Sequence, residues 1–222
     1  MKNLAKHACY CLLITWLLAG CDHKKLPILG EPSLVTMAVK GKQVKQLIYP
    51  VIPDFTFKSQ DNELITQRHF DGKIYVANFF LANGPAIGNQ IHKNMLKVYD
   101  RFKSHQNIRI ISHSVDPEND TPIVLKRHAK SLGVTGNFWY FVTGESQKIR
   151  EIGKKYYVVG HDDMGNDASE PVHICSFLLI DKEKHIRGMY DATSVLSTKE
   201  LIKDIEKLLD EYQSSSTPSK KI

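Results

Sequence analysis

Cysteine is scarce in this sequence, and three of the four cysteines lie within the first 21 residues. We expect Cys9 and Cys11 to be removed with an N-terminal leader and Cys21 to be consumed by lipid, which leaves Cys175 as the one thiol of the mature chain. Dithiol exchange needs an attacking thiolate and a second, resolving thiol. The mature chain is therefore expected to form no intramolecular disulfide and to perform no dithiol chemistry, even in a compartment that permits disulfides.

Excess charge of one sign is also small. The formal net charge is +6, but Lys2 and Lys6 lie near the start of the chain and Lys220 and Lys221 near its end. Without these four residues, 26 basic side chains stand against 24 acidic ones. Nucleic-acid binding needs a clustered basic face, so we expect no nucleic-acid partner.

The apolar run near the N-terminus, residues 8–20, is short, because a membrane span needs about 20 apolar residues. It follows two lysines and ends in Leu-Ala-Gly-Cys at residues 18–21, which looks like a bacterial lipobox. We expect residues 1–20 to be a lipoprotein signal peptide and Cys21 to be the lipid anchor. The alternative is a buried N-terminal helix with an incidental cysteine, which Gly20 and Asp22 would end. The predicted location is the bacterial cell envelope, extracytoplasmic and anchored to the membrane by lipid.

The rest of the chain indicates one domain between two polar ends. Residues 21–45 are polar and interrupted by proline and glycine, which predicts a membrane-proximal linker. Residues 46–213 contain the apolar segments of a single core. Residues 214–222 predict a disordered tail.

Strands and helices alternate along residues 46–213. The run 74–81 is almost wholly apolar, as expected of a central strand buried on both faces. The other expected strands form a hairpin over 55–57 and 64–66 and cover 108–115, 138–142, 174–180 and 186–190. One expected helix contains Ile91 to Phe102, and two others cover 121–132 and 145–156. The last helix is expected to begin at Ser197, with a capping box completed by Glu200. This order predicts an α/β, thioredoxin-like fold, with a central mixed sheet flanked by helices and an N-terminal β-hairpin extension.

In such a fold the working loop follows the first central strand and meets the N-terminus of the next helix, where a cysteine would be favoured as thiolate. Here the loop is Ala-Asn-Gly-Pro-Ala-Ile-Gly-Asn, residues 82–89. It contains no thiol, carboxylate or imidazole. We therefore expect no nucleophile and no general acid or base at this position.

Four blocks of sequence follow one another between residues 53 and 193. They are Asn78-Phe79-Phe80 with Lys93-Asn94-Met95, Ser-Val-Asp-Pro-Glu-Asn-Asp-Thr-Pro at 114–122, Trp-Tyr-Phe-Val-Thr-Gly at 139–144, and His173 with the strand segments 177–182 and 188–191. Together they resemble the Sco/SenC family of thioredoxin-fold copper chaperones, which are associated with assembly of the copper site of cytochrome c oxidase. The resemblance implies copper as cofactor, and a cuproenzyme subunit or another copper protein as partner.

The family binds copper through a C-x-x-x-C pair and a distant histidine. The resemblance places the two cysteine positions on Gly84 and Gly88 and the histidine position on His173. Because soft thiolates make such a site prefer Cu(I), a lone imidazole cannot replace them. The C-x-x-x-C site is therefore predicted to be defunct, with His173 as the remaining candidate metal ligand. The alternative is that His173 is an ordinary histidine at the end of a strand.

Cys175 is a possible substitute ligand, because it lies two residues after His173 and would share its face of a strand. Further donors in the preceding loop are His161, Asp162, Asp163 and Met164. The favoured alternative is that Cys175 is a small buried apolar side chain and the loop a solvated turn.

Other polar residues are expected to be structural. Asp116 should hold a turn together with Pro117. The remaining histidines show no ligand spacing and are expected to lie on the surface or in packing contacts; they are His69, His92, His105, His113, His128 and His185.

Three functions can be weighed on these grounds. The first is a membrane-anchored Sco/SenC-like protein of copper handling or cytochrome c oxidase assembly with a defunct C-x-x-x-C site. The second is a non-catalytic thioredoxin-fold module that binds proteins at the membrane. The third, a thiol enzyme, needs an exposed cysteine near a helix N-terminus. Cys175, expected within a strand, argues against the third, and we expect no enzymatic activity.

Overall fold

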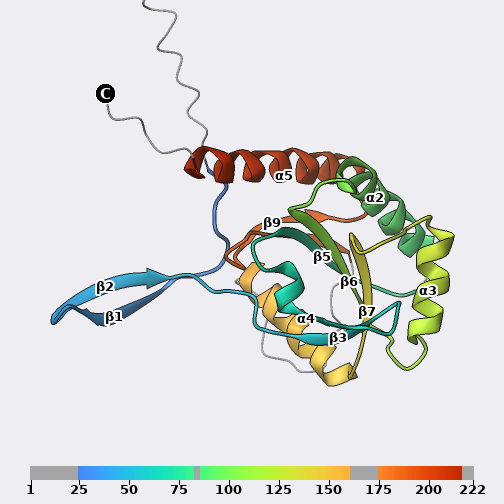
Figure 1. Cartoon of the computed structure of the whole chain (residues 1–222), viewed down its shortest axis with the longest axis horizontal. Coiled ribbons are helices and arrows are strands. Elements are labelled where there is room, and N and C mark those ends of the chain that lie inside the picture. Colours follow the sequence, from blue (N-terminus) through green and yellow to red (C-terminus); the bar gives the residue numbers. More distant parts are fainter. Residues whose placement is uncertain (1–24, 83–85, 161–174, 217–222) are drawn as a thin grey trace, which may run out of the picture.

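A seven-stranded mixed sheet forms the centre of the computed structural model, which describes residues 25–82, 86–160 and 175–216 (Figure 1). The strand order is β4-β3-β7-β6-β5-β8-β9. The strands are β3 (Thr56–Ser59), β4 (Leu64–Thr66), β5 (Ile74–Phe80), β6 (Ile108–Ser114), β7 (Trp139–Thr143), β8 (Ser176–Ile180) and β9 (Ile186–Asp191). The three central strands β5, β6 and β7 run parallel. On one side β3 pairs antiparallel with β7 and β4 with β3, and on the other β8 pairs antiparallel with β5 and β9 with β8. The predicted α/β architecture with a central mixed sheet is confirmed.

Helices cover both faces of this sheet. They are η2 (Gln67–Phe70, a short 3-10 helix), α2 (Ala86–Phe102), α3 (Pro122–Ser131), α4 (Ser146–Gly160) and α5 (Val195–Ser216). Side chains of β5 alternate between two cores, as the period of a strand requires. Val76 and Phe80 pack with α2, α3 and α5, whereas Tyr75 and Phe79 pack with α4 and η2. Among the described residues, no helix combines the length and the hydropathy that crossing a membrane requires.

The last helix begins and ends differently from the prediction. Ser197 was expected to cap it, but α5 starts at Val195, and the amide of Ser197 donates to Oγ of Ser194 at 3.2 Å. Ser194 is therefore the capping residue, and Ser197 lies in the first turn. The helix continues to Ser216, so the tail expected from residue 214 is wrong at its start. Residues 217–222 lie outside the described part.

A separate hairpin replaces most of the expected linker. Strands β1 (Ser33–Val39) and β2 (Lys42–Ile48) pair antiparallel, and the turn between them places Lys40 and Gly41 at φ 50° and 78°. Positive φ at both central residues is what a tight hairpin turn of this kind requires. The expected membrane-proximal linker over 21–45 therefore contains paired strands from residue 33 onward, and β2 crosses the expected domain boundary at residue 46.

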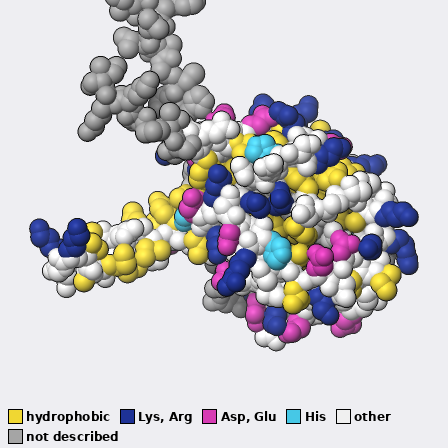
Figure 2. Space-filling model, in the orientation of Figure 1, with side chains coloured by type: hydrophobic (Ala, Val, Ile, Leu, Met, Phe, Trp, Pro, Cys, Tyr) yellow, Lys and Arg dark blue, Asp and Glu magenta, His cyan; other side chains and the backbone are white. Residues whose placement is uncertain are grey.

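This hairpin projects from the rest of the molecule (Figure 1). Its large apolar side chains are exposed: Leu34, Met37, Val39, Val44, Leu47 and Ile48. Figure 2 shows hydrophobic side chains along its length and basic side chains at its far end. The register explains the exposure, because Leu34 pairs with Leu47 on one face while Met37 pairs with Val44 on the other. Neither face is apolar throughout, which is why the alternation in the sequence was not recognised as a strand pair.

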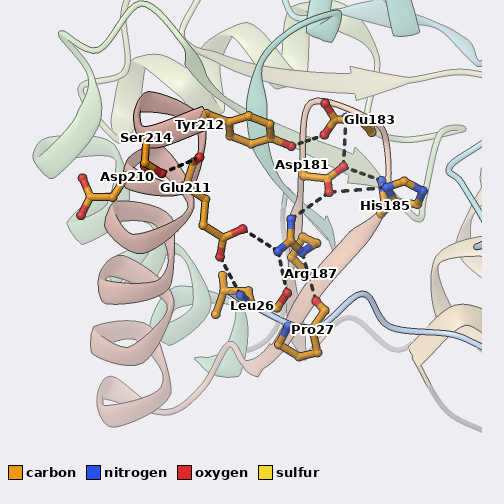
Figure 3. Close-up of polar contacts among 10 residues, drawn as sticks. All are labelled: Leu26, Pro27, Asp181, Glu183, His185, Arg187, Asp210, Glu211, Tyr212 and Ser214. Atoms are coloured by element: carbon orange, nitrogen blue, oxygen red, sulfur yellow. Dashed lines mark hydrogen bonds and ion pairs between the residues drawn. The ribbon is translucent and has the colours of Figure 1, made fainter. Parts of the chain in front are cut away.

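A buried arginine fastens the segment before the hairpin to the domain (Figure 3). The guanidinium of Arg187, which is 8% exposed, donates to the carbonyl oxygens of Leu26 at 2.6 Å and Pro27 at 3.1 Å. It also contacts the carboxylates of Asp181 at 3.1 Å and Glu211 at 2.8 Å. Glu211 in turn accepts from the amide of Leu26 at 2.6 Å. This cluster, called the Arg187 clamp below, joins the N-terminal segment to β9 and α5.

Candidate functional site

The site expected from the sequence lies where β5 ends and α2 begins. Gly88 is in the first turn of α2, and among the described residues a Cβ added there would meet no atom within 4 Å outside its own helix turn. The helix therefore has room for a larger side chain at a position that the resemblance gives to a cysteine. Residues 83–85, including Gly84, lie outside the described residues.

The acidic segment after β6 supports the start of this loop. Oδ2 of Asp120 accepts hydrogen bonds from Oγ of Ser114 at 2.6 Å and from the amide of Ala82 at 3.2 Å. Asp120 and Ser114 are buried, so these contacts fix the backbone just after β5. Both carboxylate oxygens of Asp116 accept from Nδ2 of Asn119, at 3.0 and 2.8 Å, which confirms the expected role of Asp116 in a turn.

Polar residues of the other recognised blocks also act in the scaffold. Nε1 of Trp139 donates to Oγ of Ser112 at 2.9 Å, and that hydroxyl donates to Oδ1 of Asn78 at 2.6 Å. Nδ2 of Asn94 on α2 donates to the carbonyl oxygen of Ala192 at 2.9 Å. These buried bonds hold the central strands and α2 in place around the loop.

Cys175 lies directly before β8, and not within a strand as expected. Its free side chain is half-buried and packs against the core formed with α2, α3 and α5. Its carbonyl oxygen accepts from the amide of Ala192 at 2.8 Å. The packing favours the interpretation of Cys175 as a small apolar side chain. His173 and residues 161–164 lie outside the described residues, so a ligand role for them stays a prediction.

Two histidines that the sequence left as surface or packing residues lie together beside this site. The rings of His92 on α2 and His128 on α3 are 4.5 Å apart between centroids. Phe80 stacks on His128 at 5.5 Å, and Phe141 meets it edge-on at 5.4 Å. His92 is 6% exposed, and Nε2 of both histidines is buried without a hydrogen-bond partner in the part of the chain that the structure describes.

Both imidazoles are neutral at neutral pH. Burial lowers the pKa of His92 from 6.5 to about 4, and the neighbouring His128 adds to the decrease. Burial also lowers the pKa of His128, against an opposing effect of Asp120. Neutral imidazole is the form that binds metal ions. Across residues 25–82, 86–160 and 175–216, no three or more His, Cys, Asp or Glu side chains form a group that could hold a metal ion.

A groove elsewhere on the surface is unrelated to this site. It has a volume of about 470 Å³ and is lined by residues 53–57 together with Lys148, Glu151 and Ile152 of α4. Phe55, Phe57 and Ile152 belong to the core on the α4 face, opposite the face that holds Phe80 and Phe141. Gly88, which is the only position assigned to metal binding by the resemblance that the structure describes, does not line this groove.

Comparison with known proteins adds to these observations. The SCO1/SenC family model matches residues 44–210. The chain is 28% identical over 180 residues to the SCO1 protein homolog of Bacillus subtilis (strain 168), which covers 80% of this chain and 92% of that protein. An SCO1/SenC family lipoprotein from Bacillus anthracis str. Ames has a similar structure, with a TM-score of 0.62 at 25% identity over 72% of this chain and 95% of the other. A similar structure is that of BsSco, a member of the Sco family of cytochrome c oxidase assembly proteins in which a disulfide switch was identified. Its TM-score is 0.60 at 25% identity, over 72% of this chain and 93% of the other. These likenesses confirm the predicted thioredoxin-like fold.

Proposed function

Because the chain belongs to the SCO1/SenC family, we propose that it acts in copper handling for cytochrome c oxidase assembly, through a site that differs from the C-x-x-x-C site. The observation that carries the proposal is the family match over residues 44–210, which includes all seven strands of the central sheet. Copper is cargo in this role, and the partner is a cuproenzyme subunit or another copper protein.

The loop itself does not fit Cu(I) held by two thiolates. Glycine stands at positions 84 and 88, and Cys175 is the only cysteine after Cys21. We propose that His173 acts together with further donor side chains of this chain, because one imidazole alone is a weak site for Cu(I). The proposal includes no enzymatic activity, since residues 82–89 offer no nucleophile and no titratable side chain.

Anchoring to the membrane is part of the proposal. The lipobox-like residues 18–21 support acylation of Cys21, and the similar protein from Bacillus anthracis is a lipoprotein. The proposed location is the outer side of a bacterial membrane, where a copper protein of the respiratory chain would be within reach.

One observation favours a second candidate function, a protein-binding module at the membrane. The hairpin β1–β2 leaves six large apolar side chains exposed (Figure 2). Exposed apolar surface of this extent is typical of an interaction site. In this alternative the fold presents a recognition surface and handles no metal.

Copper titration of a protein comprising residues 22–222 tests the first function against the second. Cu(I) and Cu(II) are titrated separately into the wild type, into His173→Ala, and into Gly84→Cys/Gly88→Cys. We expect submicromolar binding by the wild type in one oxidation state. We expect binding of Cu(I) more than about tenfold tighter in the double variant, because thiolates suit Cu(I) and Gly88 has room for a side chain.

The outcomes separate the two functions. The absence of binding by the wild type in both oxidation states contradicts copper handling and leaves the recognition module. His173→Ala is also made in the Gly84→Cys/Gly88→Cys variant. If His173 occupies the family's histidine position, this change should weaken the Cu(I) affinity of the restored site.

A further inference from the structure

The β1–β2 hairpin is the part of the described chain that packs least against the domain. All seven residues of β2 are exposed, as are six of the seven residues of β1. A two-stranded hairpin that packs on nothing else is at best marginally stable in water. We therefore expect a further surface to cover this hairpin when the protein is in place.

Apolar side chains lie on both faces of the hairpin. By the strand register, Leu34 and Leu47 share one face, and Met37, Val39 and Val44 share the other. A flat protein surface would contact one of these faces and leave the other in water. The boundary between lipid headgroups and acyl chains would surround the hairpin and take up side chains from both faces. Two apolar faces therefore favour lipid over a flat protein partner.

The charge of the hairpin is of one sign. From residue 32 to residue 53 the chain contains no acidic residue and three lysines, which are Lys40, Lys42 and Lys45. All three are exposed, and Figure 2 shows basic side chains at the far end of the hairpin. These lysines would repel those of a second copy that paired hairpin to hairpin, because like charges would then face each other. They complement a surface of anionic lipid.

Two backbone hydrogen bonds fix the base of the hairpin beside the Arg187 clamp. The amide of Leu29 donates to the carbonyl oxygen of Ile186 at 2.8 Å, and the amide of Ile52 donates to that of Lys184 at 2.9 Å. Both acceptors lie within three residues of the arginine of the clamp, which also holds the segment before the hairpin. The proposed lipid anchor would therefore bring the bilayer close to the base of the hairpin, from which the two strands project (Figure 1).

The edges of the hairpin limit how deeply it can enter the bilayer. Within the described residues, β1 and β2 pair only with each other, so each strand keeps one open edge. Open sheet edges do not occur in the hydrocarbon region, because no water there satisfies their backbone groups. The headgroup layer provides such partners and still gives the side chains access to the acyl boundary.

We propose that the β1–β2 hairpin lies in the headgroup layer of an anionic lipid bilayer, with its lysines at lipid phosphates and its apolar side chains at the acyl boundary. The inference rests on the proposed function for the location of the chain at a membrane. It goes beyond that function, because a second contact besides the anchor would fix the orientation of the domain on the bilayer.

Tryptophan reporters in residues 22–222, which include every described residue, test the contact. Trp139 is the only tryptophan of this segment and is fully buried, so an added tryptophan reports its own position. Met37→Trp and Leu34→Trp place a reporter on each face of the hairpin. Ile123→Trp is the matched control, because Ile123 is 74% exposed on α3, which lies across the domain from the hairpin (Figure 1).

The reporters are mixed with vesicles of equimolar phosphatidylglycerol and phosphatidylcholine that carry brominated acyl chains. We expect quenching of Met37→Trp and Leu34→Trp, with Ile123→Trp unchanged. To keep a weak contact measurable, the reporters are also coupled through Cys21 to a maleimide lipid, in chains of residues 21–222 with Cys175→Ser.

The affinity of the wild type for vesicles tests the role of charge. Each lysine near an anionic surface contributes about fivefold, so Lys42→Gln/Lys45→Gln should weaken binding to the mixed vesicles by about 25-fold. Lys126→Gln/Lys130→Gln removes the same charge from exposed positions on α3 and is the control. It should weaken binding by less than about twofold, because salt screens charges that lie far from the surface.

Three results overturn the inference and leave copper handling to its own titration. They are the absence of quenching in both hairpin reporters on the lipid-coupled chains, equal quenching in all three reporters, and a dimer of the wild type in sedimentation that Met37→Trp disrupts. The last result would assign the hairpin to a second copy. Lack of acylation at Cys21, seen by mass spectrometry of the full-length chain, would overturn the proposed anchoring and the inference together.

Discussion

At the scale of single residues, burial decides what each histidine does. His113 on β6 is fully buried among Phe55, Phe57 and Phe79, and its Nδ1 lies 3.3 Å from the carbonyl oxygen of Asn78. Burial lowers the pKa of His113 from 6.5 to about 4, although the hydrogen bond to Asn78 opposes the decrease. His113 therefore stays neutral in the folded protein at a pH where the unfolded chain already binds a proton.

This difference predicts a pH dependence of stability. The contribution of His113 is fully present above pH 6.5 and is lost as the pH falls toward 4, because the unfolded state then binds more protons. Between pH 7 and 5 the loss from this residue should be about 2 kcal/mol. Urea unfolding of residues 22–222 at both pH values measures it. Between these two pH values the free energy of unfolding of His113→Phe should fall by about 2 kcal/mol less than that of the wild type. Equal decreases in the two proteins would contradict the assignment.

Arg187 provides a second prediction at this scale. Replacing it with methionine removes the guanidinium from the carboxylates of Asp181 and Glu211, which should cost about 3 kcal/mol of the free energy of unfolding. Arg101→Met is the control, because Arg101 also pairs with a glutamate of α5, Glu206, but its side chain is 59% exposed. The control should cost at most about 1 kcal/mol. Equal costs in chemical denaturation would show that the Arg187 clamp contributes no more than a surface ion pair.

The residues of the candidate site divide by how far the sequence could predict them. Asp116 could be assigned to a turn, because Asp followed by Pro is a local signal. His92 and His128 could not be paired, since their contact depends on how α2 and α3 pack on one face of the sheet. The one available signal was local: His92 follows Gly88 by four residues on the same helix.

At the scale of elements, the hairpin β1–β2 contrasts with the strands of the sheet. Leu47 on β2 is 54% exposed, whereas Leu201 on α5 is fully buried. Leu201→Ala should lower the free energy of unfolding by about 3 kcal/mol, because it opens a cavity. Leu47→Ala should change it by less than about 0.5 kcal/mol. If denaturation instead shows a large cost for Leu47→Ala, the hairpin packs in solution on a surface outside this single chain, such as a second copy.

The elements that the sequence located well are those with an unambiguous pattern. The buried run of β5 and the proline at the start of α3 are strong local signals, and the structure places both within a residue or two of the prediction. The start of α5 was misplaced because Ser197 with Glu200 also fits the capping pattern, while Ser194 makes the actual cap. An N-terminal hairpin extension was predicted, but its residues were not located, because polar and apolar residues are mixed on both of its faces.

At the scale of the whole molecule, the number of thiols sets the response to redox conditions. Residues 22–222 contain Cys175 as their only cysteine. A thiol reductant should therefore leave the urea midpoint of this protein unchanged, in contrast to what a disulfide switch such as that identified in BsSco would produce. A shift that disappears in Cys175→Ser would reveal a disulfide between chains.

The order of elements was sufficient to predict the fold class, because helices between β5, β6 and β7 require parallel central strands. It was not sufficient to place β3, which joins the sheet beside β7 through two residue pairs, Lys58 with Thr143 and Ser59 with Val142. Such a short, distant pairing has no signature in the local sequence.

The Arg187 clamp limits how long the tether between the domain and the bilayer would be. If Cys21 is acylated as the sequence predicts, five residue steps separate the lipid anchor from Leu26, where the clamp begins. Five extended residues reach about 17 Å, far less than a flexible spacer of residues 21–45 would allow. The domain would then lie close to the lipid headgroups. A force applied to the lipid anchor would be transmitted through the clamp to β9 and the end of α5. Copper exchange would be confined to partners whose own site comes down to the membrane surface.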